Sequence, residues 1–401
     1  MHFKKIDLKI GALNRIQNRP ILFLTLLFVL VNGFFFWKLG VSVDDDTERF
    51  MAYADEIREF GLFFKPHDFW YLGYVLFILA ITSVYDTLAA IVLVQVLLSF
   101  LAMISLYYSG QRLFGNQTIG LLASVAFLGF YLLPFWNYWI YAESLFISLN
   151  CFALCYLIQW YTGKISWRNM LAGTLIICWA ILTKPTGIAL LAAVLVPLVY
   201  LLIKNMNKWS FKVGTVMVFV VGFLLLLNEM LSTFGFVEAY QNGEIIYGAE
   251  KVNHQAYAKG LLMVVPESLY LPDKDHPSLV QLVLLFFGNP VYSLKLFSTK
   301  LFYYILAIRP YYSFLHNTYL LGFLLPLYYL FVVGLKKSPL DTTAYLFIGC
   351  FILIHTLSGT LLTINWNSRF LLPVLPLVFL VGGNEKEKIV LKKIRLRFSA
   401  I

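Results

Sequence analysis

Long apolar runs separated by short polar stretches dominate the chain. A helix needs about 20 mostly apolar residues to cross a lipid bilayer. The runs that meet or approach this length are 21–43, 88–107, 119–135, 140–161, 167–183, 185–203, 212–231, 318–335, 342–362 and 370–383. The pattern therefore predicts an all-α polytopic membrane protein with about ten transmembrane helices, organised as one domain over residues 1–401.

Two further apolar stretches are ambiguous. The stretch 69–85 is rich in aromatic residues and rather short for a span. The stretch 290–308 carries Lys295 and Lys300 among bulky apolar residues at helical spacing. Because those lysines would otherwise sit deep in hydrocarbon, the second stretch is expected to form an amphipathic helix at the membrane interface.

The composition excludes an ordinary soluble protein. Sixty per cent of the residues are hydrophobic and 13% are charged, whereas soluble domains carry roughly 25% charged residues. The net charge of +10 would suggest nucleic acid as a partner of a soluble protein. In a membrane protein it indicates orientation instead, because basic residues collect in cytoplasmic loops. We expect membrane lipids and no nucleic acid as partners.

The distribution of lysine and arginine decides the topology. If 69–85 does not cross the membrane and the N-terminus is cytoplasmic, most of the 31 basic residues lie inside. If 69–85 crosses, every later loop inverts and the inside loses that majority. The positive-inside rule favours the first arrangement, with both termini cytoplasmic and 69–85 in the outer interface. Residues 44–87 then form an outer juxtamembrane region, and 232–317 form the one large outer loop.

Cysteine and histidine residues give no sign of a disulfide framework or a zinc site. The four cysteines lie inside apolar runs, and the histidines show no ligand spacing. The loop 232–317 has no glycine-rich phosphate loop and no βαβ pattern, so no soluble nucleotide-binding domain is expected. The basic N-terminal segment precedes a run too long for a signal peptide, and we interpret that run as a retained first span.

Acidic residues stand at two of the expected outer helix ends. Asp44, Asp45 and Asp46 follow the first span, and Glu143 lies at the mouth of the fourth. The aspartates could be a solvated stop signal, or a catalytic base or substrate ligand held at a rigid helix end. Glu143 could cap its helix, where the dipole favours an anion, or it could serve chemistry. An ionised carboxylate in such apolar surroundings costs free energy unless it is paired with a cation or hydrated.

Isolated cations stand at the same face. Lys184 interrupts two apolar runs in ILTKPTG, Arg369 precedes the last run, and Arg309 lies in AIRPYYSFLHN. Each alone could reach lipid headgroups. Together with the acids they provide what glycosyl transfer from a lipid phosphate needs. A carboxylate would deprotonate an acceptor hydroxyl, and cations would stabilise the departing phosphate.

At these residues the chain resembles integral-membrane glycosyltransferases of the GT-C fold. That class includes the protein O-mannosyltransferases and the aminoarabinose-lipid A transferases. The resemblance rests on DDD at 44–46, YAESLF at 141–146, LTKPTG at 182–187, RPYYSFLHN at 309–317 and SRFLLPVLPL at 368–377. It implies a polyprenyl-phosphate-linked sugar donor, an inverting displacement and an active site on the outer, periplasmic face.

The resemblance also implies roles for individual residues. One of Asp44, Asp45 and Asp46 would be the base that activates the acceptor, and Glu143 would be a second acid in the cavity. Lys184 and Arg369 would contact the donor phosphate, and we assign Arg309 to the same contact. Larger members carry a folded domain after the last span. Since none follows here, a glycan or lipid acceptor is expected instead of a protein.

Metal dependence and location are further expectations. Asp44 and Asp46 form a DxD pair and would be the ligands if a divalent metal binds, although we expect that no cofactor is required. We expect a bacterial plasma membrane. The alternatives are a membrane transporter or lipid flippase, or a polysaccharide polymerase or ligase. The sequence leaves the sugar, which could be a hexose or a pentose, the acceptor and the prenyl chain open.

Overall fold

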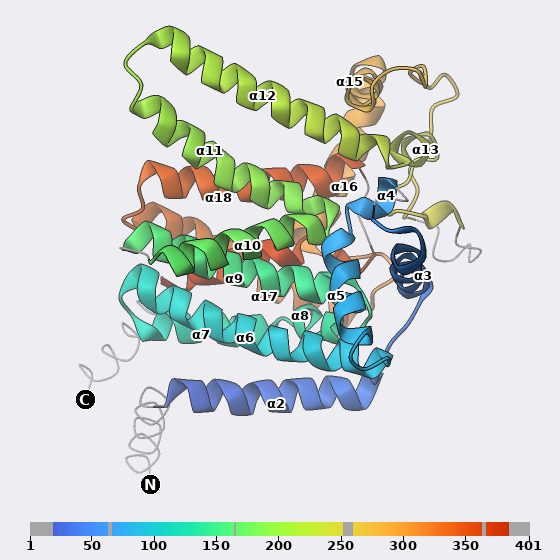
Figure 1. The fold of residues 1–401 in the computed structure, drawn as a ribbon. Helices are drawn as coiled ribbons and strands as arrows, with labels where there is room; N and C mark the ends of the chain where they lie inside the picture. Colours follow the sequence, from blue (N-terminus) through green and yellow to red (C-terminus); the bar gives the residue numbers. More distant parts are fainter. Residues whose placement is uncertain (1–18, 63–65, 164–165, 252–259, 363–365, 385–401) are drawn as a thin grey trace, which may run out of the picture.

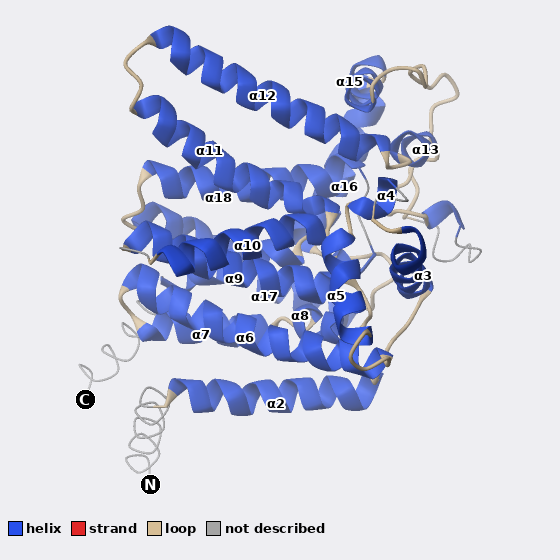
Figure 2. Ribbon diagram, viewed as in Figure 1, coloured by secondary structure: helices blue, strands red, loops and turns tan. Residues whose placement is uncertain are grey.

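A computed structural model describes residues 19–62, 66–163, 166–251, 260–362 and 366–384. Within these residues every regular element is a helix, as Figure 2 shows, and isolated bridges join only Ser42 to Trp139 and Glu244 to Leu262. The prediction of an all-α polytopic membrane protein is therefore confirmed.

Each of the ten predicted spans corresponds to a helix or a bent pair of helices. The helices that pass a length and hydropathy test are α2 (Pro20–Leu39), α6 (Leu88–Phe114), α9 (Ala142–Thr162), α11 with the preceding turn (Pro185–Lys204), α12 (Trp209–Ser232), α17 (Phe314–Lys337), α18 with the following turn (Thr342–Leu362) and the segment Trp366–Asn384. The helix α10 (Trp167–Thr183) is apolar but shorter.

The third predicted span is bent. The helix α7 (Gln117–Gly129) meets the short helices α8 (Leu132–Phe135) and η1 (Trp136–Tyr138) at 61°. Phe130 leaves the helical conformation at the end of α7, and Pro134 inside α8 has no backbone N–H to continue the hydrogen-bond ladder. After the bend, the aromatic segment 135–141 lies against α2, α6 and α9.

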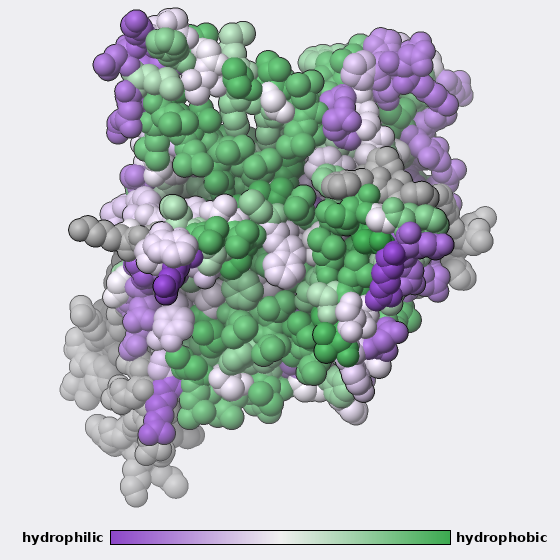
Figure 3. Space-filling model, in the orientation of Figure 1, coloured by the Kyte–Doolittle hydropathy of each residue, from purple (hydrophilic) through white to green (hydrophobic). Residues whose placement is uncertain are grey.

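The spans run side by side and present two different ends (Figure 1). At one end lie the starts of α2 and α10, the end of α9, and the hairpin turns α6–α7, α11–α12 and α17–α18. Several basic residues stand in or beside these turns, among them Lys204, Lys208, Lys336 and Lys337. Asn384 belongs to this end, because its amide donates to Ser338 Oγ at 3.1 Å. Figure 3 shows a hydrophobic belt between hydrophilic groups at the two ends. This is the arrangement that the charge pattern predicts, and which end faces the cytoplasm stays a prediction.

The opposite end carries short helices that do not cross. These are α3 (Asp45–Phe60), α4 (Pro66–Phe69), α5 (Leu72–Thr82) and α13 (Phe236–Gln241). The 11 residues of α5 reach about 16 Å, half of a hydrocarbon core, and α5 runs across the span ends in Figure 1. It is anchored there, because Trp179 of α10 donates to the Gly73 carbonyl at 2.8 Å. The stretch 69–85 therefore does not span.

The expectation for 290–308 is partly wrong. The helices α15 (Ser278–Gly288) and α16 (Pro290–Leu306) meet at 107°, and Lys295 is exposed. Lys300, however, is only 2% exposed and donates to the Leu362 carbonyl at 2.7 Å. Leu362 ends a π-helical turn (η4, Ser358–Leu362), where the wider backbone winding changes the usual carbonyl pairing. Lys300 thus stabilises a carbonyl inside the protein and does not reach the interface.

Glycine permits a close crossing of two helices in the bundle. Where α6 passes α7, a Cβ atom on Gly120 would lie 2.0 Å from the Tyr107 carbonyl oxygen, and one on Gly110 would lie 2.6 Å from the Gly120 Cα. Any side chain at these positions would force the backbones apart. The contact lies beside the α6–α7 turn, at the end opposite the predicted site residues, and it holds the two helices against each other.

Candidate active site

A cavity of about 460 Å³ opens at the end that carries α3, α4 and α5. We call it the charged cavity. Its lining is Asp44, Asp45, Asp46, Arg49, Phe50, His67, Tyr71, Tyr141, Glu143, Lys184, Thr233, Phe234, Gly235, Phe236, Ala239, Tyr247, Gly248, Leu362, Trp366, Arg369 and Phe370. All the predicted site residues except Arg309 are therefore brought together, from segments that lie far apart in the sequence.

Asp44 fixes the start of α3. It is the N-cap residue: its Oδ1 accepts from the Thr47 backbone N–H at 3.3 Å, and the Thr47 hydroxyl accepts from the Asp44 N–H at 3.2 Å. The Tyr141 hydroxyl donates to the second carboxylate oxygen of Asp44. Such a cap contributes about 1 kcal/mol to helix stability. Both oxygens of Asp44 are thus engaged in holding the helix that carries its two neighbours.

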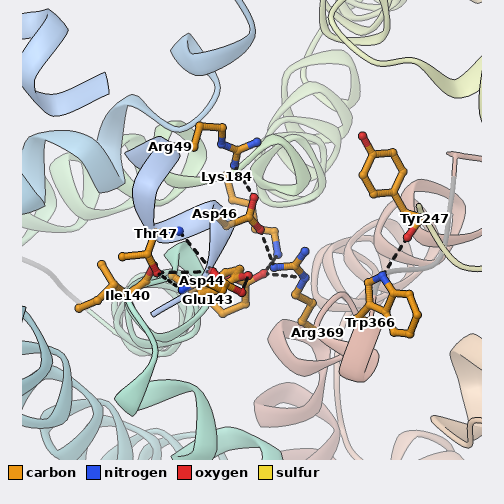
Figure 4. Close-up of polar contacts among 11 residues, drawn as sticks. Asp44, Asp46, Thr47, Arg49, Ile140, Glu143, Lys184, Tyr247, Trp366 and Arg369 are labelled. Carbon is orange, nitrogen blue, oxygen red and sulfur yellow. Dashed lines mark hydrogen bonds and ion pairs between the residues drawn. The ribbon is translucent and has the colours of Figure 1, made fainter. Parts of the chain in front are cut away.

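Asp46 lies between two arginines. Its carboxylate contacts Arg49, one turn further along α3, at 3.3 Å and Arg369, from the last span, at 3.2 Å (Figure 4). Burial alone would raise the pKa of Asp46, but the two guanidinium groups outweigh it and hold the pKa below its usual value. The Asp46 carboxylate is therefore ionised at neutral pH and tied to cations.

Asp45 differs from both neighbours. It occupies the first position of α3, is exposed and lines the charged cavity. Among the three aspartates, and within the described part of the chain, it alone has no ion pair or side-chain hydrogen bond to another residue. Its carboxylate is thus the one of the three that is open to a substrate hydroxyl.

A buried cluster of one acid and two cations forms the floor of the charged cavity. Glu143, in the first turn of α9, is 3% exposed and pairs with Lys184 Nζ at 2.5 Å. Arg369 Nε lies 3.5 Å from the same Glu143 oxygen, as Figure 4 shows. Because Arg369 also contacts Asp46, the cluster joins α3, α9, the turn after α10 and the last span into one electrostatic unit.

The backbone around Lys184 explains its position. Lys184 ends α10, and Pro185 begins the single 3₁₀ turn η2 (Pro185–Gly187) that leads into α11. A Cβ atom on Gly187 would lie 2.5 Å from the Ile181 carbonyl oxygen, so only glycine lets the turn fold this tightly against α10. The motif LTKPTG thereby places one lysine at the junction of two helices.

Aromatic rings hold the three cations in place. Lys184 Nζ lies 4.6 Å from the Phe370 ring centre, Arg369 Cζ 4.9 Å from that of Tyr141, and Arg49 Cζ 5.0 Å from that of Tyr71. Each cation–π contact contributes roughly 0.5–2 kcal/mol, more where water is excluded. The three cations are therefore held in fixed positions in the wall of the charged cavity before any anion binds.

Sequence reasoning missed Arg49 and His67. Arg49 follows Asp46 by three residues on one helix, a spacing that could have suggested the pair. His67 Nδ1 lies 2.9 Å from the Thr233 carbonyl oxygen, so Nδ1 carries the proton. Burial, followed by the charge of Arg49, lowers the pKa of His67, and its ring is therefore neutral at pH 7.

Arg309 lies outside the charged cavity. It is 1% exposed, and its Nη1 donates to the carbonyls of Tyr303 at 2.8 Å and Ile308 at 2.7 Å. These hydrogen bonds fix Arg309 at the end of α16. They do not support the predicted contact between Arg309 and the donor phosphate.

Tyr312 of the 309–317 motif, and Ala307 shortly before the motif, support the turn that carries Arg369. The Tyr312 hydroxyl donates to Asn367 Oδ1 at 2.9 Å, and Ser368 Oγ donates to the Ala307 carbonyl at 3.1 Å. Asn367 and Ser368 both have positive φ, 54° and 55°, which costs energy in residues other than glycine. These hydrogen bonds hold the strained backbone that directs Arg369 into the charged cavity.

The described residues offer no ready metal site. Within them, no group of three or more His, Cys, Asp or Glu side chains is arranged to hold a metal ion. Of the predicted DxD pair, Asp44 is engaged as a cap, and Asp46 faces two guanidinium groups that would repel a cation. The residues present therefore do not fit a divalent metal, and metal dependence itself stays a prediction.

The fold and site define a polytopic helical membrane protein with a cavity of mixed charge at one end. Residues 71–231 match the family model of the dolichyl-phosphate-mannose-protein mannosyltransferases. The matched part includes Glu143 and Lys184, whereas the aspartates 44–46 and Arg369 lie outside it. No curated protein and no solved structure shows a significant match to the chain. The match confirms the predicted resemblance and supports glycosyltransferase activity at a membrane.

Proposed function

We propose that the chain is an integral-membrane glycosyltransferase that moves a sugar from a polyprenyl-phosphate-linked donor to an extracytoplasmic glycan or lipid acceptor. The observation that carries the proposal is the charged cavity, in which Asp45 is open beside three oriented cations. The cavity lies at the end opposite the basic hairpin turns, which would be the periplasmic face of a bacterial plasma membrane.

Lys184, Arg369 and Arg49 would bind the donor phosphate. The phosphodiester of the donor carries one negative charge, and the departing polyprenyl phosphate gains a second as the glycosidic bond breaks. Cations that are already fixed by Glu143, Asp46 and the aromatic rings stabilise this charge more in the transition state than in the ground state. Glu143 therefore acts by positioning the cations.

Asp45 would be the base. It takes the proton from the acceptor hydroxyl while that oxygen attacks the anomeric carbon from the face opposite the phosphate. The bond between the anomeric carbon and the phosphate oxygen breaks, its electron pair stays on the phosphate, and the configuration inverts. Asp44 and Asp46 are less suited because their carboxylates are engaged with a helix end and with two arginines.

The test uses the full chain in membrane vesicles supplied with a polyprenyl-phosphate sugar. The matched family makes mannose the first sugar to try. Asp45→Asn should lower transfer by about 10²- to 10⁴-fold, the usual effect of removing a general base. The matched control is Asp55→Asn on the same helix, where Asp55 pairs with Arg58 and neither residue lines the cavity. The control should transfer at close to the wild-type rate.

Two outcomes would contradict the proposal. Full transfer by Asp45→Asn would show that Asp45 is not the base. Full transfer by Asp44→Asn and Asp46→Asn as well would show that none of the three aspartates is the base. Movement of the lipid across the vesicle membrane without a new glycosidic bond would instead indicate a transporter or flippase.

A further inference from the structure

A second hollow, of about 750 Å³, adjoins the charged cavity. We call it the polar hollow. It lies between the end of α12, α13 and the loop before α15, and it is lined by Asn228, Ser232, Phe234, Gly235, Phe236, Val237, Glu238, Gln241, Pro272, Lys274, Asp275, His276, Pro277, Ser278 and Gln281. Phe234, Gly235 and Phe236 line both spaces, so the two are separated only by this short segment.

The side chains of the polar hollow suit hydroxyl groups. Gln241 and His276 each combine a hydrogen-bond donor with an acceptor, Glu238 and Asp275 accept, and Lys274 donates. A sugar hydroxyl likewise donates and accepts. Because the lining contains two carboxylates and one lysine, the polar hollow does not favour a phosphate or another anion. The matching ligand class is a neutral glycan.

The polar hollow is held by hydrogen bonds on two sides. Gln281 of α15 donates from Nε2 to the carbonyls of Lys274 at 3.1 Å and His276 at 2.6 Å, which fixes the loop. On the other side, the Leu279 N–H donates to Asn228 Oδ1 of α12 at 3.1 Å. The loop is therefore fastened both to its own helix and to the end of a span.

The location of the polar hollow favours a water-borne ligand over a lipid tail. The helices α13 and α15 lie at the end that carries α3 in Figure 1, and Figure 3 shows hydrophilic residues over the α15 region beyond the hydrophobic belt. A glycan chain extending into water could occupy the hollow, whereas an acyl or prenyl chain would have to leave the hydrocarbon to do so.

Gly235 belongs to the short segment that lines both spaces. It is exposed, and a Cβ atom on it would meet only Glu238 Oε2, at 3.6 Å, an ordinary contact. Its φ of −80° is open to any residue. A large side chain at position 235 would therefore stand between the charged cavity and the polar hollow without straining the backbone.

We propose that the polar hollow is the acceptor subsite and binds a neutral glycan, whose terminal sugar passes over Gly235 to place its hydroxyl at Asp45. This inference rests on the proposed glycosyltransferase function and selects a glycan over a lipid as the acceptor. The inner sugars of the glycan then lie in the polar hollow, and the donor keeps the charged cavity.

The experiment uses the purified full chain with polyprenyl-phosphate mannose as donor. The acceptor probes are neutral methyl glycosides of one, two and three hexoses. Two rates are measured: sugar transfer to the glycan, and release of free sugar to water. Since each net hydrogen bond contributes about 1 kcal/mol, the wild-type KM should fall by about tenfold or more from one hexose to three.

Two variants test the site independently. Gly235→Phe and Gln241→Ala should each remove the advantage of the longer glycan. Release of free sugar to water is measured in Gln241→Ala, where it should continue, because Gln241 does not line the charged cavity. The second variant changes only an exposed side chain and leaves the fold intact. The control is Glu267→Gln, an exposed residue of the same outer loop that lines neither space, which should keep the full length dependence.

The outcomes separate this proposal from the one on which it rests. A wild-type KM independent of glycan length, or a length advantage that survives in both variants, would overturn the acceptor subsite. If the wild type neither transfers sugar nor releases it to water, the glycosyltransferase proposal itself fails, and the acceptor subsite fails with it.

Discussion

The buried pair of Glu143 and Lys184 offers the most quantitative test of how the charged cavity is built. Three variants are needed: Glu143→Gln, Lys184→Met and the double variant. Each single change removes one charge and leaves its partner buried, since the side chains are 4% and 3% exposed. The double change removes both charges and keeps the volume nearly constant.

The geometry sets the size of the effect. At a separation of 2.5 Å the Coulomb attraction is about 7 kcal/mol for an effective dielectric constant of 20. Much of this is offset by the cost of taking both charges out of water, so breaking such a pair costs about 3–5 kcal/mol. Replacing the whole pair with neutral groups is often close to neutral.

The assay is denaturant unfolding of the detergent-solubilised chain, read as a double-mutant cycle. We expect Glu143→Gln to lose about 3–5 kcal/mol of unfolding free energy and the double variant to recover most of it. Lys184→Met should lose less, because Arg369 stays 3.5 Å from the Glu143 carboxylate. The double variant should still fail in sugar transfer, because Lys184 no longer meets the donor phosphate. A Glu143→Gln protein as stable as the wild type would refute the pairing. So would additive losses in the double variant.

Three further predictions concern packing, pH and metal. Gly120→Ala should destabilise the chain by about 2 kcal/mol or more, because the added Cβ lies 2.0 Å from the Tyr107 carbonyl oxygen. Gly33→Ala, with open space around it, is the control, and equal melting temperatures would contradict the crossing. Since the folded-state pKa of Asp46 is lowered, its ion pairs contribute stability above the unfolded-state pKa of about 4, and this contribution is lost as the pH falls through the lowered value. The melting temperature should therefore be flat from about pH 5 to 8 and fall below about pH 4, and this fall should be smaller in Arg369→Gln. An identical acid profile in that variant would contradict the assignment. Chelation with EDTA should leave sugar transfer unchanged, because lysine and arginine take the place of a metal at the phosphate. Loss of transfer that Mn²⁺ or Mg²⁺ restores would contradict this.

The spans were predictable because the cost of exposing polar groups to hydrocarbon leaves few choices. The distribution of basic residues alone predicted that 69–85 does not cross the membrane, and the 11-residue α5 confirms that prediction. Lys300 was misjudged for a physical reason. Its partner is a carbonyl 62 residues away at the end of a π-helical turn, and backbone geometry of that kind leaves no mark in the side-chain pattern.

The site residues also divide into those that the sequence indicated and those that it did not. Glu143 and Lys184 could be singled out because a charge at an apolar helix end needs a partner or water. Their pairing could not be read from the sequence, since it depends on how α9 meets the turn after α10. Arg49 and His67 were missed because they lie in polar stretches, where one more charged or aromatic side chain does not stand out. Arg309 was singled out on a motif, but a motif does not tell into which space a side chain points.

The most direct test of the central claim is mass spectrometry of what the reconstituted full chain makes from a polyprenyl-phosphate sugar and a neutral methyl trihexoside as acceptor. We predict a new glycoside of inverted configuration together with free polyprenyl phosphate, and about 10²- to 10⁴-fold less of the glycoside from Asp45→Asn. Donor that is moved across the bilayer with its glycosidic bond intact would contradict the account.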